Sequence, residues 1–455
     1  MCRNMMRKMS VMLIGLCVCL LVCTPVLAAT DSAAEKTQII FLLDASQSME
    51  KEGRWADASD SACMISAALP ENYEAALLVY NSEILYREDF GKIGQGTRNV
   101  LEKIEMGGYT APGIALETAC SMFGTDATSK RVVFLTDGEI SMRNAEATAE
   151  ALGNYESAVE TAEKNNVRID MFVLPDEDTS NEVKRGTEAT SGELYTAGRS
   201  QTLEDISVKY LFDLLGIERI DLGEAQTEGE KITVDLQDTY MKNAKILLIA
   251  GKPIQDFHVM GQCEEVSVMQ GNKVAVAELT NPMQDEVVID YILEERAGVH
   301  AYLIKEYDLK AEIGQAYTSG SGDFDIEVSV LNHQGRQVLD AEHLKDAITI
   351  SINGTDTEYR VENKTALLAY KTDATESISI EVQAEASGNM IYTSSMAGIV
   401  ELTVPVVEEK PDYTVLWIVI GVLAVSLILL VVIYNAKKQK KTIKAGKKAR
   451  ASRSF

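Results

Sequence analysis

Continuous apolar runs recur through the first half of the chain, at residues 39–43, 75–80, 132–135 and 171–174. Strands that are covered on both faces of a parallel sheet have this uninterrupted pattern. Stretches with helical spacing separate or follow the runs, at residues 56–69, 113–123, 145–165 and 203–215. The alternation predicts an α/β domain with a doubly wound, mostly parallel sheet over residues 35–216.

The pattern changes to a period of two from about residue 217. Ile232, Val234 and Leu236 alternate with polar residues, and a hairpin is predicted where Val266 and Val268 face Val274 and Val276 across residues 270–273. The same alternation returns between residues 308 and 408. We expect one or two β-sandwich domains, with a β-rich domain at 217–307 and an immunoglobulin-like sandwich at 308–408.

Two further apolar runs lie near the ends of the chain. Residues 11–23 follow a basic start and precede small residues, which is typical of a signal peptide over residues 1–28. Residues 415–434 carry no charge and are long enough for a transmembrane helix. The tail at 435–455 has nine Lys or Arg and no acid, so the positive-inside rule places it in the cytoplasm. We therefore expect a single-pass protein of the cell membrane whose N-terminal part is extracytoplasmic.

Charge and cysteine content narrow the classes of partner and source. Residues 29–434 hold 31 of the 43 basic residues and all 69 acidic ones, so nucleic acid is not expected as a partner. Only Cys63, Cys120 and Cys263 follow the predicted signal peptide, too few for a disulfide framework. An exported domain of this size with so few bridges favours a bacterial protein, with a single membrane.

Oxygen-bearing side chains follow the first predicted strand at alternate positions: Asp44, Ser46 and Ser48. Side chains two apart share a face of an extended segment, and carboxylate and hydroxyl oxygens suit hard cations. Thr110 lies before a predicted helix and Asp137 ends another predicted strand, so both belong to edges of the same sheet. Helix caps and turns explain each of these residues singly. Their joint occurrence at three edges favours a metal site.

These segments resemble the metal-ion-dependent adhesion site of the von Willebrand factor A family. The resemblance covers residues 37–216 and rests on "DASQS" (44–48), "GGYTAPGIAL" (107–116), "VVFLTDGE" (132–139) and "ATSGELY" (189–195), with Pro112 as a local departure. It implies that Ser46, Ser48 and Thr110 bind a cation directly, and that Asp44 and Asp137 bind it directly or through water. Mg²⁺ is expected, with Mn²⁺ or Ca²⁺ as alternatives. In this family a carboxylate from a protein ligand completes the metal's coordination.

The sequence thus predicts a membrane-anchored binding or adhesion protein that captures an acidic group through a divalent cation. The alternative is an accessory or assembly subunit of a larger membrane or cell-envelope complex. An enzyme is not expected, because the four histidines are scattered and no nucleophile–base set or phosphate loop is legible.

Overall fold

The computed structural model describes residues 36–174, 181–198, 202–223, 231–318, 322–392, 396–402, 418–420 and 422–431. The chain forms two compact units, Met1–Thr403 and Val404–Phe455. The predicted signal peptide and basic tail lie outside the described residues, as do parts of the predicted membrane span.

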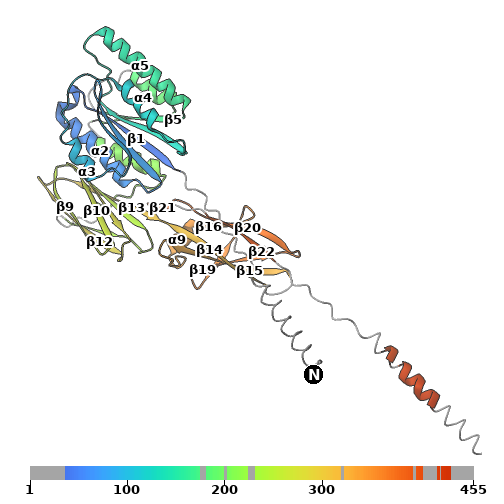
Figure 1. The fold of residues 1–455 in the computed structure, drawn as a ribbon. Coiled ribbons are helices and arrows are strands. Elements are labelled where there is room, and N and C mark those ends of the chain that lie inside the picture. Colours follow the sequence, from blue (N-terminus) through green and yellow to red (C-terminus); the bar gives the residue numbers. More distant parts are fainter. Residues whose placement is uncertain are drawn as a thin grey trace, which may run out of the picture. The chain divides into compact units, whose positions relative to one another are not determined.

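A six-stranded sheet organises the N-terminal part of the first unit, in the order β3-β2-β1-β4-β5-β6 (Figure 1). Its strands are β1 (Thr37–Asp44), β2 (Tyr73–Tyr80), β3 (Ile84–Gly91), β4 (Ser129–Thr136), β5 (Val167–Val173) and β6 (Leu194–Thr196). β1 pairs in parallel with β2 and β4, as the continuous apolar runs predict. β3 was not predicted. It runs antiparallel to β2 at the edge of the sheet, where its outer face meets solvent and its residues alternate in exposure.

Helices cover both faces of this sheet (Figure 1). They are η1 (Gln47–Gly53), α2 (Arg54–Ala68), α3 (Gln95–Leu101), α4 (Pro112–Met122), α5 (Ala145–Lys164), α6 (Asn181–Ala189) and α7 (Leu203–Leu215). Ile39, Phe41 and Leu43 of β1 pack on the side of α2 and α7. Ile40 and Leu42 point the other way, into the core formed with α4 and α5. The α/β class with a mixed, mainly parallel sheet is therefore confirmed, and the predicted helices end within two residues of the observed bounds.

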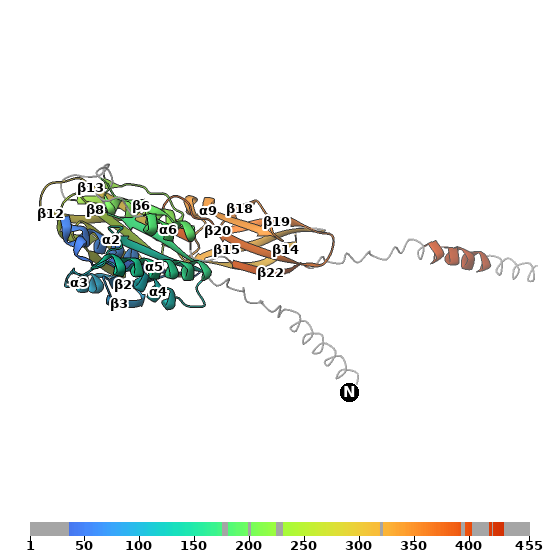
Figure 2. The same cartoon turned by 90° about the horizontal axis from the view of Figure 1, so that it is seen from above.

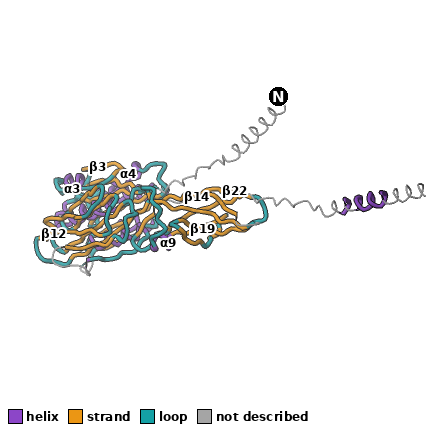
Figure 3. The backbone as a smooth tube through the Cα atoms, turned by 90° about the horizontal axis from the view of Figure 1, so that it is seen from below, coloured by secondary structure: helices purple, strands orange, loops and turns teal. Residues whose placement is uncertain are grey.

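Strands dominate the described residues from position 231 to 402 (Figure 3). A five-stranded sheet has the order β10-β11-β8-β13-β21, and a three-stranded sheet has the order β7-β12-β9. These strands are β7 (Lys231–Asp235), β8 (Asn243–Ala250), β9 (Ile254–Met260), β10 (Glu265–Gln270), β11 (Val274–Thr280), β12 (Glu286–Leu293), β13 (Val299–Tyr307) and β21 (Met390–Tyr392). The predicted hairpin is present as β10 and β11, although Met269, not Val268, pairs with Val276.

Two four-stranded sheets follow, in the orders β14-β15-β19-β18 and β17-β16-β20-β22 (Figure 2). Their elements are β14 (Leu309–Thr318), β15 (Asp323–Asn332), α9 (Glu342–Ala347), β16 (Ile348–Ile352), β17 (Thr355–Asp356), β18 (Tyr359–Glu362), β19 (Thr365–Lys371), β20 (Glu376–Ala384) and β22 (Met396–Leu402). The chain crosses the predicted boundary at 307–308 with one residue between β13 and β14. It then returns a strand, β21, to the earlier sheet, so the two sets of strands interlock.

Helix α2 joins the α/β part to the five-stranded sheet. Its buried residues share one core with Leu247, Ile249 and Val276 of that sheet. Polar contacts border this core: Asp60 of α2 accepts hydrogen bonds from the Arg98 side chain and from the Asn272 amide. The helix that follows the predicted metal loop is thus held by packing on both sides.

Residues 418–420 and 422–431 are helical. Among the residues that are described, no helix combines the length and the apolar character needed to cross a membrane. The membrane anchor at 415–434 therefore stays a prediction from the sequence.

Candidate metal centre

Asp44 is the last residue of β1 and is fully buried. Its carboxylate accepts hydrogen bonds at Oδ1 from the Ser46 amide (2.8 Å) and at Oδ2 from the Thr136 hydroxyl (2.9 Å). Thr136 is the last residue of β4, the neighbouring parallel strand, so the contact ties two strand ends together. The geometry follows from the parallel sheet, because the carboxyl ends of adjacent strands meet at one edge.

Ser46 and Ser48 face each other across the turn that follows Asp44. Their hydroxyl oxygens are 3.0 Å apart. Ser46 occupies the N-cap position of η1, yet its side chain makes no capping hydrogen bond. Ser48 lies inside η1 and is half-buried. The capping explanation therefore accounts for neither hydroxyl, and the two lie within hydrogen-bond distance of each other.

Hydrogen bonds bring the loop of Thr110 to the same edge. The Gly107 amide donates to the carbonyl of Ala45 (2.9 Å), and the Asn81 side chain donates to the carbonyl of Gly107 (2.7 Å). Gly108 has a φ of 77°, a conformation that side chains rarely adopt. Thr110 is buried, and its amide donates to the carbonyl of Ser141 (2.9 Å). Helix α4 begins at Pro112 with Ala111 as its N-cap, so Thr110 is not the cap.

Asp137 follows β4 directly and is 1% exposed. Neither of its carboxylate oxygens has a hydrogen-bond partner among the described residues. Arg54 Nη1, from the first residue of α2, lies 3.8 Å from Asp137 Oδ2. An ordinary turn aspartate would bond nearby amides with its side chain. A buried carboxylate without hydrogen bonds is instead costly, and it calls for another partner.

The electrostatics of the site favour the arrival of a cation. Burial raises the pKa of Asp44 to about 6, and the nearby charge of Asp137 adds to the rise. The hydrogen bonds from Ser46 and Thr136 act in the opposite direction and do not cancel it. Two desolvated carboxylates that repel one another are stabilised by a divalent ion between them.

The donor set suits a small hard cation. It offers the hydroxyls of Ser46, Ser48 and Thr110 with the carboxylates of Asp44 and Asp137, and all of these are oxygen donors of the kind that Mg²⁺, Mn²⁺ and Ca²⁺ take. Within the described ranges, no cluster of three or more His, Cys, Asp or Glu side chains is placed to hold a metal. A metal at this edge would therefore depend on hydroxyls as much as on carboxylates.

The structure adds residues to the site that the sequence pattern did not indicate. Thr136 orients Asp44, and its oxygen also accepts from the Gly138 amide (3.1 Å). Tyr80 ends β2 opposite Asp44, and its buried hydroxyl has no hydrogen-bond partner among the described residues. In the sequence, only their position at the ends of predicted strands could have indicated that Thr136 and Tyr80 belong to the site. Nothing in the sequence indicated Arg54, because its burial depends on how α2 packs.

Ser48 is half-buried, whereas the other four predicted ligands are buried. Ser48 lines a surface depression of about 580 Å³ together with Gln47, Glu50 and Lys51. Asp44, Thr110 and Asp137 are buried. A ligand would therefore approach from the side of Ser48.

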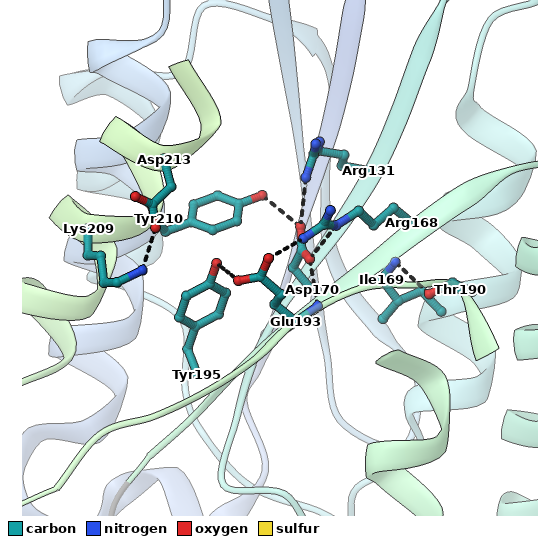
Figure 4. Close-up of polar contacts among 10 residues, drawn as sticks. All are labelled: Arg131, Arg168, Ile169, Asp170, Thr190, Glu193, Tyr195, Lys209, Tyr210 and Asp213. Atoms are coloured by element: carbon teal, nitrogen blue, oxygen red, sulfur yellow. Dashed lines mark hydrogen bonds and ion pairs between the residues drawn. The ribbon is translucent and has the colours of Figure 1, made fainter. Parts of the chain in front are cut away.

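A second buried carboxylate, Asp170 of β5, lies elsewhere in the same sheet (Figure 4). It accepts from Arg168 Nε (2.8 Å), Arg131 Nη1 (3.2 Å), the Tyr210 hydroxyl (3.1 Å) and the Glu193 amide (3.0 Å). Protein groups satisfy this carboxylate completely, as is usual for a structural ion pair in a protein core. We assign it to stability and not to binding.

Residues 39–139 match the family model described as von Willebrand factor type A domain. The matched segment runs from β1 through Asp137 and so contains every residue of the candidate metal centre. The strand order, the flanking helices and this match define the class of the N-terminal part. The chain contains a von Willebrand factor type A domain, as its resemblance in sequence predicted.

Several solved structures are similar in part. The von Willebrand factor type A protein from Catenulispora acidiphila is 14% identical, with 67% of this chain and 64% of that chain covered and a TM-score of 0.35. The pilus adhesin SpaC from Lactobacillus rhamnosus GG is 11% identical, with 78% and 65% covered and a TM-score of 0.35. An aerotolerance-related membrane protein from Bacteroides fragilis is 16% identical, with 39% and 97% covered and a TM-score of 0.29. No curated protein matches the sequence.

Proposed function

We propose that this chain is a membrane-anchored binding protein that holds an acidic group of a protein ligand through a divalent cation. The observation that carries the proposal is the state of Asp137, whose carboxylate is buried without a hydrogen bond from any described residue, beside a second buried carboxylate. If Asp137 served only the fold, we would expect protein groups to donate hydrogen bonds to its carboxylate, as they do to that of Asp170.

The residues of the site would have different roles in metal binding. Ser46, Ser48 and Thr110 would supply neutral oxygen ligands, and Asp44 and Asp137 the negative charge. When bound, Mg²⁺ (or Mn²⁺ or Ca²⁺ in its place) supplies a Lewis-acidic position for a carboxylate of the ligand. Thr136 holds Asp44 in place through its hydrogen bond to Oδ2. The ligand would enter from the depression that Ser48 lines.

The setting of the site is proposed from the sequence. The domain would be extracytoplasmic on a bacterial cell membrane, tethered by residues 415–434 with the basic tail in the cytoplasm. Neither catalysis nor nucleic-acid binding belongs to this proposal. The role of an accessory or assembly subunit remains the alternative, and a stoichiometric membrane partner in co-purification would favour it.

Isothermal titration of Mg²⁺ into the full-length chain in detergent micelles tests the metal site. We expect binding by the unaltered protein and its loss in Asp137→Asn, with a marked weakening in Ser46→Ala. Ser66→Ala is the matched control, because it removes a buried hydroxyl of α2 that donates to the Ala62 carbonyl (2.8 Å) and lies outside the candidate metal centre. Equal Mg²⁺ affinity in Asp137→Asn and the unaltered chain would contradict the proposal.

The acidic-ligand step needs its own measurement. Mn²⁺ bound to the protein enhances water proton relaxation through its coordinated water, and a carboxylate that takes that position lowers the enhancement. We expect acetate to lower it in a saturable manner, whereas neutral acetamide should not. A response to acetamide equal to that of acetate would argue against recognition of an acidic group.

A further inference from the structure

Arg54 is a buried arginine in an unfavourable position for helix stability. It is the first residue of α2, reached through Gly53 in a left-handed conformation (φ 77°), and it is 6% exposed. The N-terminal end of a helix carries partial positive charge and disfavours a cation. Burial adds a desolvation cost. The helix therefore does not explain why an arginine is held at this position.

The candidate metal centre does explain it. Arg54 Nη1 lies 3.8 Å from Oδ2 of Asp137, whose oxygens have no hydrogen bonds within the described part of the chain. At that distance the guanidinium compensates the charge of Asp137 without forming a short, directional bond to it. The carboxylate is thus neutralised in part and still has both oxygens available for a metal.

We propose that Arg54 is a positioning and specificity-determining residue of this metal centre, which weakens cation binding and makes the loaded site selective for anionic ligands. The inference rests on the proposed function. Asp44, Asp137 and Arg54 together carry a charge of −1, so a bound divalent ion brings the site to +1. Without Arg54 the loaded site would be neutral, and its attraction for a carboxylate would be smaller.

In the metal-free protein Arg54 has a second effect. It stands in for the cation beside Asp137 and limits the cost of that buried charge. Metal and Arg54 therefore compete for the same carboxylate. Removing the charge of Arg54 should change the stability of the metal-free and metal-loaded forms by different amounts.

Three measurements on the full-length chain at pH 7.5 test the proposal with Arg54→Gln. We expect Mn²⁺ to bind about tenfold more tightly and acetate to bind the Mn²⁺-loaded protein about threefold more weakly, since one unit charge near the ion is lost. We also expect the melting temperature in EDTA to fall by several degrees, and this fall to shrink in saturating Mn²⁺. Arg54→Lys keeps the charge and should restore both affinities toward those of the unaltered chain.

Arg98→Gln is the matched control. Arg98 is also buried and donates to an aspartate, Asp60, at 2.6 Å, but it belongs to α3 and lies outside the metal centre. Its loss should lower the melting temperature equally with and without Mn²⁺ and leave Mn²⁺ affinity unchanged. If Arg54→Gln does not fold, Arg54→Met, which keeps the apolar stem of the side chain, takes its place.

The outcomes separate this inference from the proposed function. Unchanged Mn²⁺ affinity in Arg54→Gln, or an equal loss of stability in EDTA and in Mn²⁺, overturns the role of Arg54. The metal site itself would stand in that case, provided that Asp137→Asn still abolishes binding. Absence of Mn²⁺ binding by the unaltered chain overturns both.

Discussion

Two buried carboxylates of the six-stranded sheet and its edge, Asp170 and Asp137, differ in the hydrogen bonds that they receive. Asp170 receives four hydrogen bonds, from two arginines, a tyrosine and a backbone amide (Figure 4). Asp137 receives none from the described residues and has only a guanidinium at 3.8 Å. Both are buried to the same degree, so burial alone does not distinguish a structural acid from a ligand-binding one. The supply of hydrogen-bond donors does.

Position in the sheet accounts for this difference. Asp170 lies within β5, where Arg131 of β4, Arg168 of β5 and Tyr210 of α7 point toward it (Figure 4). Asp44 and Asp137 lie at the carboxyl ends of β1 and β4, where loops replace strands and where ligands bind in open parallel sheets. The four predictions below test whether the hydrogen-bonded carboxylate of Asp170 stabilises the fold, and whether the carboxylates of Asp44 and Asp137 bind a metal instead.

The largest effect is expected at the satisfied carboxylate. Asp170→Ala leaves two arginines and the Tyr210 hydroxyl without their acceptor, and should lower the free energy of unfolding by about 3 to 5 kcal/mol. Urea denaturation measures the loss, and Mg²⁺ affinity of the folded protein should not change. Asp213→Ala is the control, because its ion pair with Lys209 is exposed and should contribute less than about 1 kcal/mol. A loss of similar size in both variants would contradict the structural role of Asp170.

The second effect is a pH dependence that concerns Asp44 in EDTA. Its folded pKa of about 6 lies above that of an unfolded aspartate, about 3.9, so the folded state binds this proton more tightly. The stabilisation that the folded protein gains from protonated Asp44 is complete below about pH 4 and is lost as the pH rises through about 6. Asp44→Asn should therefore be more stable than the unaltered protein by about 3 kcal/mol at pH 8, with no such gain at pH 4.

Urea denaturation of both proteins across this range measures the difference. Subtracting the two curves removes the titration of all other groups, which the variants share. A difference that does not vary with pH would show that Asp44 is not the titrating group.

The third effect is stabilisation by the metal. Mg²⁺ at one hundred times its dissociation constant should raise the free energy of unfolding by about 2.7 kcal/mol, and EDTA should reverse the gain. Asp137→Asn should show no gain at the same concentration. Thermal unfolding in Mg²⁺ and in EDTA provides the measurement, with Ca²⁺ and Mn²⁺ in parallel runs to rank the cations. Equal stabilisation of Asp137→Asn would place the bound metal elsewhere.

The smallest effect compares two buried tyrosines. The Tyr210 hydroxyl donates to Asp170 at 3.1 Å, whereas the Tyr80 hydroxyl has no hydrogen-bond partner among the described residues. Tyr210→Phe should lower the free energy of unfolding by about 1.5 kcal/mol, since a bond to a charged group is lost. Tyr80→Phe should leave it unchanged or slightly higher in EDTA. Equal losses in the two variants would contradict the difference between the sites.

Much of the α/β part was predictable because its strands are covered on both faces. The apolar run at 39–43 has no polar position that could face solvent, so it reads as a buried strand, and β1 is buried throughout. The edge strand β3 was missed, since its alternating residues resemble those of many exposed segments. The return of β21 to the sheet of β13 was also missed, because strand pairing over such a distance leaves no local signal.

The sequence by itself determined which oxygen atoms reach the edge of the sheet. Asp44 ends a buried strand and Asp137 directly follows another, so the placement of both follows from the strand ends. The extended segment expected for residues 44–48 was wrong beyond Ser46, because a 3-10 helix begins at Gln47 and contains Ser48. Only the tertiary structure decided which of these groups other protein atoms satisfy. Asp44 receives a hydrogen bond from Thr136, Asp137 receives none from the described residues, and Arg54 is buried beside it. These contacts depend on how α2 packs and on which residues distant in the sequence come close in space. The sequence pattern shows neither, because hydrogen bonding and desolvation depend on the three-dimensional arrangement.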